Sequence, residues 1–136
     1  MRDYQKTVVK AFPAAAANNT TDPIQVGANK GSTPTAGAIT CGPSDGHLEI
    51  DVPALPALVD GDVTFTVEDS ADNSSWASAV GYGNLSIPGV AVTGSSRWNK
   101  RLAIHPHLRP FVRLKAAVHA NGGNNTALSY TFALNI

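Results

Sequence analysis

The chain has 136 residues, and its ten basic and ten acidic residues cancel. This length suits one domain, residues 1–136, with its own core. A charged fraction of 15%, together with 12 Gly and 9 Pro, predicts short strands and many turns. The zero net charge gives no basis for electrostatic binding to nucleic acid or to an anionic membrane. The single cysteine, Cys41, excludes an internal disulfide and predicts folding in a reducing cytoplasm.

The first third of the chain predicts extended segments separated by polar stretches. Residues 7–12 and 24–26 are short apolar pieces, and the alanines at 14–17 are too few for a helix before the Asn and Thr residues that follow. Residues 28–38, ANKGSTPTAGA, are small, polar and rich in Gly and Pro, which predicts a flexible arm or loop. Neither a signal-peptide run nor a membrane-spanning apolar stretch is present in the sequence.

The middle of the chain carries a clearer strand pattern. Residues 48–52 alternate apolar and acidic side chains, and the PALPAL segment that follows predicts an extended connector or a sheet edge. Asp60 and Gly61 predict a turn into a second alternating strand, VTFTV at 63–67. The polar run at 68–75 predicts a loop, and we expect Trp76 to fold back over the core.

Short pieces around residues 80–82, 85–87 and 90–92 are punctuated by Gly and Pro, and residues 98–104 form a further alternating strand. The last third predicts a hairpin, with strands at 112–118 and 128–136 joined by an Asn- and Gly-rich turn at 121–125. About eight short strands without a convincing helix predict an all-β, two-sheet β-sandwich of jelly-roll type.

Two groups of residues in the sequence are candidate metal ligands. The loop carboxylates Asp69 and Asp72 are weak calcium candidates, but they lack EF-hand spacing, and a structural turn is the favoured interpretation. The pair His105 and His107 is similar in spacing to zinc ligands, yet a third and fourth ligand have no recognisable position. We therefore predict no metal and no other cofactor.

Catalytic chemistry has no recognisable pattern in this sequence. Cys41 and the serines do not lie in a strand–turn–helix elbow, and no carboxylate pair stands out as acid and base. We expect Cys41 to pack as a small apolar side chain. The sequence therefore predicts a binding or structural module and not an enzyme.

Basic residues concentrate between positions 97 and 115, with Trp98 and Phe111 among them. Such a strip can bind single-stranded nucleic acid. It can equally form the outward side of two strands that contact an acidic protein, because the planar guanidinium of Arg pairs well with carboxylates. The zero net charge favours the protein contact. The basic residues of the strip are Arg97, Lys100, Arg101, Arg109, Arg113 and Lys115.

Two motifs in this order resemble those of the small capsid cement, or head decoration, proteins of tailed bacteriophages. The first is an apolar alternation followed by D-S-x-D-x-S-x-aromatic, within VTFTVEDSADNSSW, and the second is a Pro-, Arg- and aromatic-containing strand, within HPHLRPFVRLKAAV. The terminal ALSYTFALNI strand and the N-terminal TVVKAFPAAAANNTTDPIQVG segment extend the likeness. The matching residues are Val67, Asp69, Ser70, Asp72, Ser74 and Trp76, then Pro110, Phe111, Arg113 and Leu114.

This resemblance implies a jelly-roll-like protein of the virion, made in the host cytoplasm, which binds the outside of the assembled head. Its partners would be the major capsid protein and further copies of itself, as a homotrimer or homodimer, and it would need no active site. The alternative is a carbohydrate-binding β-sandwich module or adhesin domain, which uses exposed aromatic rings and often a structural calcium. The candidate contact residues are Trp76, Tyr82, Trp98, Arg97, Arg101 and Arg109.

Overall fold

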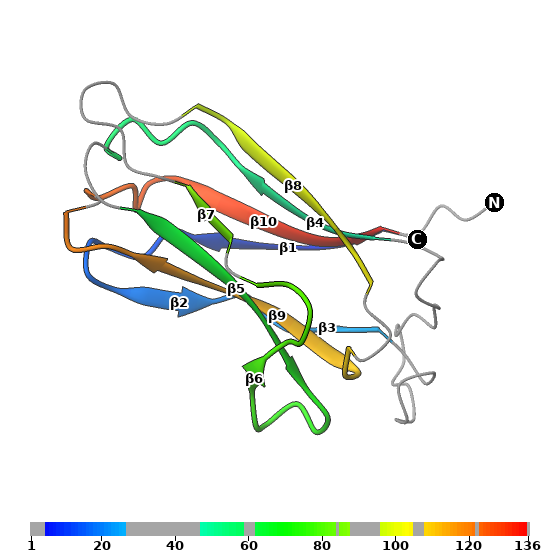
Figure 1. Cartoon of the computed structure of the whole chain (residues 1–136). Coiled ribbons are helices and arrows are strands. Elements are labelled where there is room, and N and C mark those ends of the chain that lie inside the picture. The colour runs from blue at the N-terminus through cyan, green and yellow to red at the C-terminus, as the bar shows by residue number, and fades with distance from the viewer. Residues whose placement is uncertain are drawn as a thin grey trace.

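The computed structural model describes residues 5–26, 47–58, 62–83, 85–87, 96–104, 108–121 and 123–135. These residues contain no helix, and therefore none with the length and apolar content for crossing a membrane. They form two antiparallel sheets that stack as a β-sandwich (Figure 1). The strands are β1 (Gln5–Ala11), β2 (Asn18–Thr20), β3 (Ile24–Gln25), β4 (His47–Val52), β5 (Val63–Ser70), β6 (Ala77–Ser78), β7 (Leu85–Ile87), β8 (Trp98–Ala103), β9 (Phe111–Val118) and β10 (Ser129–Asn135).

The two sheets differ in how continuous their strands are. Sheet A has the order β1-β10-β4-β8. Sheet B has the order β2-β9-β5-β6, with β3 also paired to β9 and β7 also paired to β5. The long β5 and β9 strands form the centre of sheet B and pair from Val63 opposite Val118 to Ser70 opposite Phe111. Both edges of sheet B are therefore built from short strands in succession.

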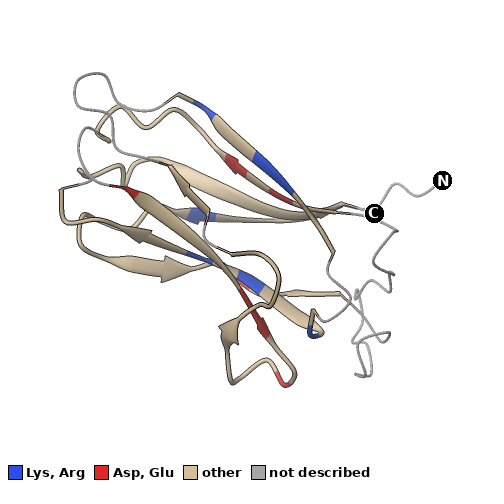
Figure 2. Ribbon diagram, viewed as in Figure 1, with Lys and Arg blue, Asp and Glu red and all other residues tan. Residues whose placement is uncertain are grey.

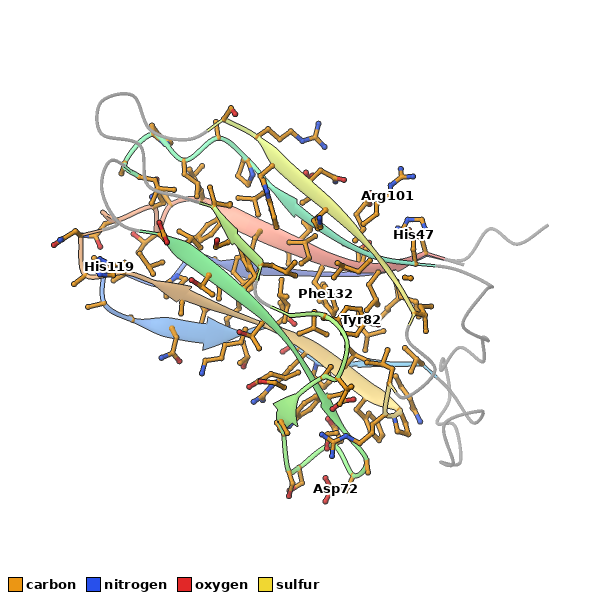
Figure 3. The ribbon with its side chains drawn as sticks, viewed as in Figure 1. His47, Asp72, Tyr82, Arg101, His119 and Phe132 are labelled. Atoms are coloured by element: carbon orange, nitrogen blue, oxygen red, sulfur yellow. The ribbon has the colours of Figure 1, made fainter. Side chains whose placement is uncertain are left out.

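The alternation in the sequence decides which side chains enter the core. On β4 and β9 every second residue is buried and the residues between them are half-buried, as the period-2 pattern predicts. Aromatic rings join the sheets, because Phe65 of β5 packs against Tyr130 of β10 at a centroid distance of 5.5 Å. Figure 3 shows Phe132, also on β10, between the two layers. The expected all-β sandwich is confirmed.

The expected hairpin between residues 112–118 and 128–136 is wrong. Both segments are strands, but β9 belongs to sheet B and β10 to sheet A. The loop at 119–128 therefore crosses from one sheet to the other. Asn and Gly residues mark a chain reversal, but they do not decide whether the next strand pairs with the previous one or packs across from it.

The PALPAL connector contributes side chains to the core. The sequence predicted an extended connector here but not its burial. Leu55 and Leu58 are fully buried. Gly123 has a positive φ of 72°, and a Cβ at this position would overlap the carbonyl oxygen of Ala57. Asn125 is buried, and its side-chain oxygen accepts a hydrogen bond from the Ala57 backbone N–H at 3.2 Å. The connector is thus held by the loop that precedes β10.

A neighbouring amide completes this end of the sandwich. Asn124 Oδ1 accepts a hydrogen bond from the Ala15 backbone N–H at 2.8 Å, which ties the β1–β2 turn to the same loop. We call the turn at 14–17, the connector at 53–58 and the loop at 119–128 the amide end. Its cross-loop hydrogen bonds use neutral side chains, so neither pH nor salt acts on them directly.

The edge strands of sheet A carry lysines on their core side. Lys6 and Lys10 of β1 lie opposite Leu134 and Tyr130, and Lys100 of β8 lies opposite Ile50. All three lysines are nevertheless exposed. A charged side chain on the inner side of an edge strand discourages another strand from pairing there, because pairing would bury the charge.

Several expectations fall outside the described residues. They are the arm or loop at 28–38, the environment of Cys41, the Asp60–Gly61 turn, the piece at 90–92 and the pair His105 and His107.

Candidate binding surfaces

The loop after β5 places Trp76 on the outer face of sheet B. Arg113 of β9 points outward opposite Glu68 of β5, and its Nε donates a hydrogen bond to Glu68 Oε1 at 2.8 Å. The Trp76 ring lies over the same guanidinium, with its centroid 4.3 Å from Cζ. The expectation that Trp76 folds over the core is wrong. The guanidinium attracts the ring to the outer face, because a planar cation stacks favourably on an indole.

A network of hydrogen bonds fixes the turn that leads to Trp76. Asp72 Oδ1 accepts hydrogen bonds from Ser70 Oγ and from the backbone N–H groups of Ser74 and Ser75, each at 2.9 Å. These hydrogen bonds lower the pKa of Asp72 below its ordinary value, and the bond from the Ser75 N–H has the largest effect. Asn73 has a positive φ of 59°, which Asn tolerates better than most residues. Asp72 lies at the tip of this loop (Figure 3).

Asp69 has the most buried side chain of any ion-pair partner among the described residues. Arg109 Nε and Nη2 both donate to Asp69 Oδ1, at 2.8 and 2.6 Å, and the Arg109 backbone N–H donates to Oδ2 at 3.0 Å. The Asp69 side chain is 4% exposed and the Arg109 side chain 40%. The pair joins the end of β5 to the segment before β9. We call this pair, the Glu68–Arg113 pair, the loop at 71–75 and Trp76 the charged end.

The outer face of sheet A also carries charges, and these are paired. Arg97 donates from Nε and Nη2 to the two carboxylate oxygens of Asp51 at 3.0 and 3.1 Å, and Arg101 lies 3.4 Å from Glu49. The hydrogen bond from Arg97 lowers the pKa of Asp51. Both arginine side chains are 71% exposed, so each pair contributes little to stability. Figure 3 shows Arg101 on the outside of β8.

The basic strip predicted from the sequence is divided by the fold. Arg101 belongs to β8 in sheet A and Arg97 directly precedes that strand, whereas Arg113 and Lys115 belong to β9 in sheet B (Figure 2). The strip is therefore not one continuous surface. Within the described ranges Lys115 has no ion-pair partner, while all four arginines there are paired.

The two remaining aromatic contact candidates pack against the core. Trp98 is half-buried and stacks on Phe65, with a centroid distance of 5.6 Å and an interplanar angle of 9°. Tyr82 is half-buried, and its hydroxyl donates to the backbone oxygen of Ala103 at 2.8 Å. Each ring presents only part of its surface to solvent. Their role in a contact stays a prediction.

The candidate metal ligands that the structure describes do not form a metal-binding group. Across the described part of the chain, no three His, Cys, Asp or Glu side chains form a group suited to a metal ion. Asp69 and Asp72 are occupied by Arg109 and by the loop, respectively. His47 and His119 lie at opposite ends of the sandwich (Figure 3).

The fold unites the two motifs that carry the family resemblance. The first motif ends β5 and forms the following loop, and the second begins β9 about forty residues later. Asp69 contacts Arg109, Ser70 lies opposite Phe111, and Trp76 covers Arg113. Sequence alone placed these residues on strands and loops but missed the pairing of Glu68 with Arg113. Comparison with protein-family models and with curated proteins finds no match for the chain.

Proposed function

We propose that this chain is a capsid cement protein of a tailed bacteriophage. It binds the outer surface of the assembled head and stabilises contacts between major capsid subunits. It acts as a homodimer or homotrimer, through contact surfaces and not through a catalytic site or a cofactor. Such a role requires a rigid scaffold and a complementary face.

The strand order supports a jelly roll. When β2 and β3 are taken as one interrupted strand along β9, and β6 and β7 as one along β5, eight strand positions remain. Sheet A then contains the first, eighth, third and sixth, and sheet B the second, seventh, fourth and fifth. The first pairs with the eighth, the second with the seventh, the third with the sixth and the fourth with the fifth. This pairing is the one expected for a long antiparallel hairpin rolled into two sheets, and it supports the jelly-roll topology.

The observation that carries the functional proposal is the convergence of the two resemblance motifs at the charged end. Glu68 and Trp76 meet Arg113, from a distant part of the chain, and the three side chains form one cluster on an outer face. Trp and Arg are the side chains that most often anchor protein interfaces. A cluster held in this way outside the core supports a role in contact with a partner.

The proposed function has a simple thermodynamic basis. A protein that binds the assembled shell, and not the free capsid subunit, stabilises the shell by mass action. Light scattering and a binding assay test this directly. The probes are heads assembled from the major capsid protein of the same genome, and that protein as free subunits.

We expect a dimer or trimer whose mass does not change with chelator, and which sediments with assembled heads but not with free subunits. A monomer that ignores heads, loses stability in chelator and binds glycans would contradict the proposal. A non-binding β-sandwich of similar size, added at the same concentration, controls for protein trapped in the pellet.

A carbohydrate-binding module is the second candidate. It is favoured by the position of Trp76 outside the core, next to a sheet face whose outward residues Thr20, Thr64 and Thr66 carry hydroxyls. Aromatic rings beside hydroxyl groups suit a sugar ring. A glycan array tests this function, and an array with no binding above background would exclude it for the glycans present.

A further inference from the structure

We infer that the outer face of sheet B, around Trp76, Arg113 and Lys115, docks on the protein partner. We infer further that the partner presents an Asp or Glu carboxylate there, beside aliphatic side chains. This inference rests on the proposed function. It adds the docking face and the chemistry of the contact.

The charge of this face is unbalanced. Among the outward residues of β5 and β9, Glu68 is the one anion, and Arg113 and Lys115 are cations. Glu68 is held by Arg113, which leaves Lys115 without an ion pair among the residues that the structure describes. Lys115 lies between Thr66 of β5 and Thr20 of β2, so neighbouring strands supply it with no carboxylate directly opposite. A carboxylate of the partner would give Lys115 the ion pair that these residues do not supply.

The aromatic part of the face is already fixed in place. The Arg113 guanidinium holds one side of the Trp76 ring, and Glu68 holds Arg113. Binding therefore loses little side-chain entropy, which favours affinity. The neighbouring outward residues Thr64 and Thr66 are uncharged, and a low charge density is typical of the buried centre of an interface. Aliphatic side chains of the partner would pack on the open part of the indole.

Sheet A offers a poorer docking face. Its outward arginines, Arg97 and Arg101, are already paired with Asp51 and Glu49. Its edges carry Lys6, Lys10 and Lys100 on the core side, where an added strand would bury them. Docking through an edge of sheet A is therefore disfavoured. On its outer face, the described Arg, Asp and Glu side chains on and beside β4 and β8 are already paired with one another.

A charge reversal with a matched control tests the inference. Lys115→Glu and Lys100→Glu make the same change at two lysines, one on each sheet, neither of which forms an ion pair with a residue that the structure describes. Affinity for the assembled heads named above is measured for the wild type and both variants, after circular dichroism and thermal melting have shown that each is folded. We expect Lys115→Glu to weaken binding by about tenfold or more, because it places like charges together. Lys100→Glu should change affinity by less than about twofold.

Trp76→Ala tests the apolar part, with Val9→Ala on the outer face of sheet A as its control. We expect Trp76→Ala to weaken binding about thirtyfold, as for an interface anchor. Equal binding by the wild type, Lys115→Glu and Trp76→Ala would overturn the docking face and leave the proposed function intact. Failure of the wild type to bind heads would overturn both. Loss of binding in Trp76→Ala but not in Lys115→Glu would overturn the carboxylate contact.

Discussion

The two ends of this sandwich are held by different chemistry. At the amide end, Asn124 and Asn125 accept hydrogen bonds from backbone N–H groups, and Gly123 lies close to Ala57. At the charged end, Asp69 pairs with Arg109, and Asp72 organises its own loop. Neutral amides and close backbone contact fix loops without using an ionic side chain. Ionic side chains fix loops and, at their margins, present charge and aromatic surface for binding.

The largest effect is expected at the amide end. Gly123→Ala should lower the free energy of unfolding by about 3 kcal/mol or more, because the added Cβ meets the Ala57 carbonyl and the positive φ is strained. Gly83→Ala is the matched control, since Gly83 also has a positive φ, of 63°, but open space around its Cβ position. It should cost only about 1 kcal/mol. Chemical denaturation measures both, and equal losses would show that the close contact is unimportant.

The charged end should respond next. Arg109→Ala leaves the buried carboxylate of Asp69 without its guanidinium, and we expect a loss of about 2–3 kcal/mol, moderated by solvent that reaches the Arg109 site. Arg97→Ala removes an exposed pair with Asp51 and should cost less than about 1 kcal/mol. Urea denaturation of the two variants separates the buried pair from the exposed one. Similar losses would contradict the difference in burial.

The two tryptophans should behave differently in the same measurement. Trp98→Ala removes the ring stacked on Phe65 and should destabilise the protein by about 2 kcal/mol, because the core loses packing. Trp76→Ala removes a ring outside the core and should cost less than about 1 kcal/mol. Thermal melting of the two variants shows which substitution lowers the stability more. A larger loss for Trp76→Ala would mean that the charged end supports the fold more than its packing indicates.

The smallest effect concerns pH. Asp51 and Asp72 have pKa values below the ordinary 3.8, so the folded state holds these two carboxylates ionised at lower pH than the unfolded state. Their contribution is complete above about pH 4 and is lost as pH falls through their folded pKa values, because the unfolded chain then binds more protons. The free energy of unfolding should therefore decrease as the pH is lowered from about 5 to about 2.

Asp72→Asn sharpens this test. The amide oxygen of Asn can accept the hydrogen bonds from Ser74 and Ser75 that Asp72 Oδ1 accepts, but it does not titrate. We expect the variant to fold and to show a shallower loss of stability below pH 4. An unchanged slope would mean that Asp72 contributes nothing to the acid sensitivity. The amide end, with neutral cross-loop bonds, should add nothing to it.

Sequence patterns were most informative for the long strands and least informative for the short ones. Residues 63–67 and 112–118 alternate strictly, so their buried and outward sides were predictable before any partner was known. Strand β2 was missed, because Asn18, Asn19 and Thr20 favour turns in isolation. Asn19 is instead held by Tyr130, whose hydroxyl donates to Asn19 Oδ1 at 2.7 Å. A long-range contact overrode the local preference.

At the candidate binding surface, too, local features were predictable from the sequence and long-range contacts were not. Outward positions for Arg113 and Lys115 were predictable from alternation on one strand. The pairing of Glu68 with Arg113, and the placement of Trp76 above them, depend on the register between β5 and β9. No local pattern specifies that register, so Trp76 was expected over the core.

By itself, then, the sequence determined the all-β class of the fold, the buried and outward faces of the strands at 63–67 and 112–118, and the polar loop that follows the first of them. The physical reason is that alternation and turn chemistry act between residues close in the chain. Only the tertiary structure decided that the loop before β10 joins two sheets, that Leu55 and Leu58 enter the core, and that the two distant motifs meet. Those outcomes depend on packing between segments far apart in the chain, where the best arrangement of the whole core selects the partner of each strand.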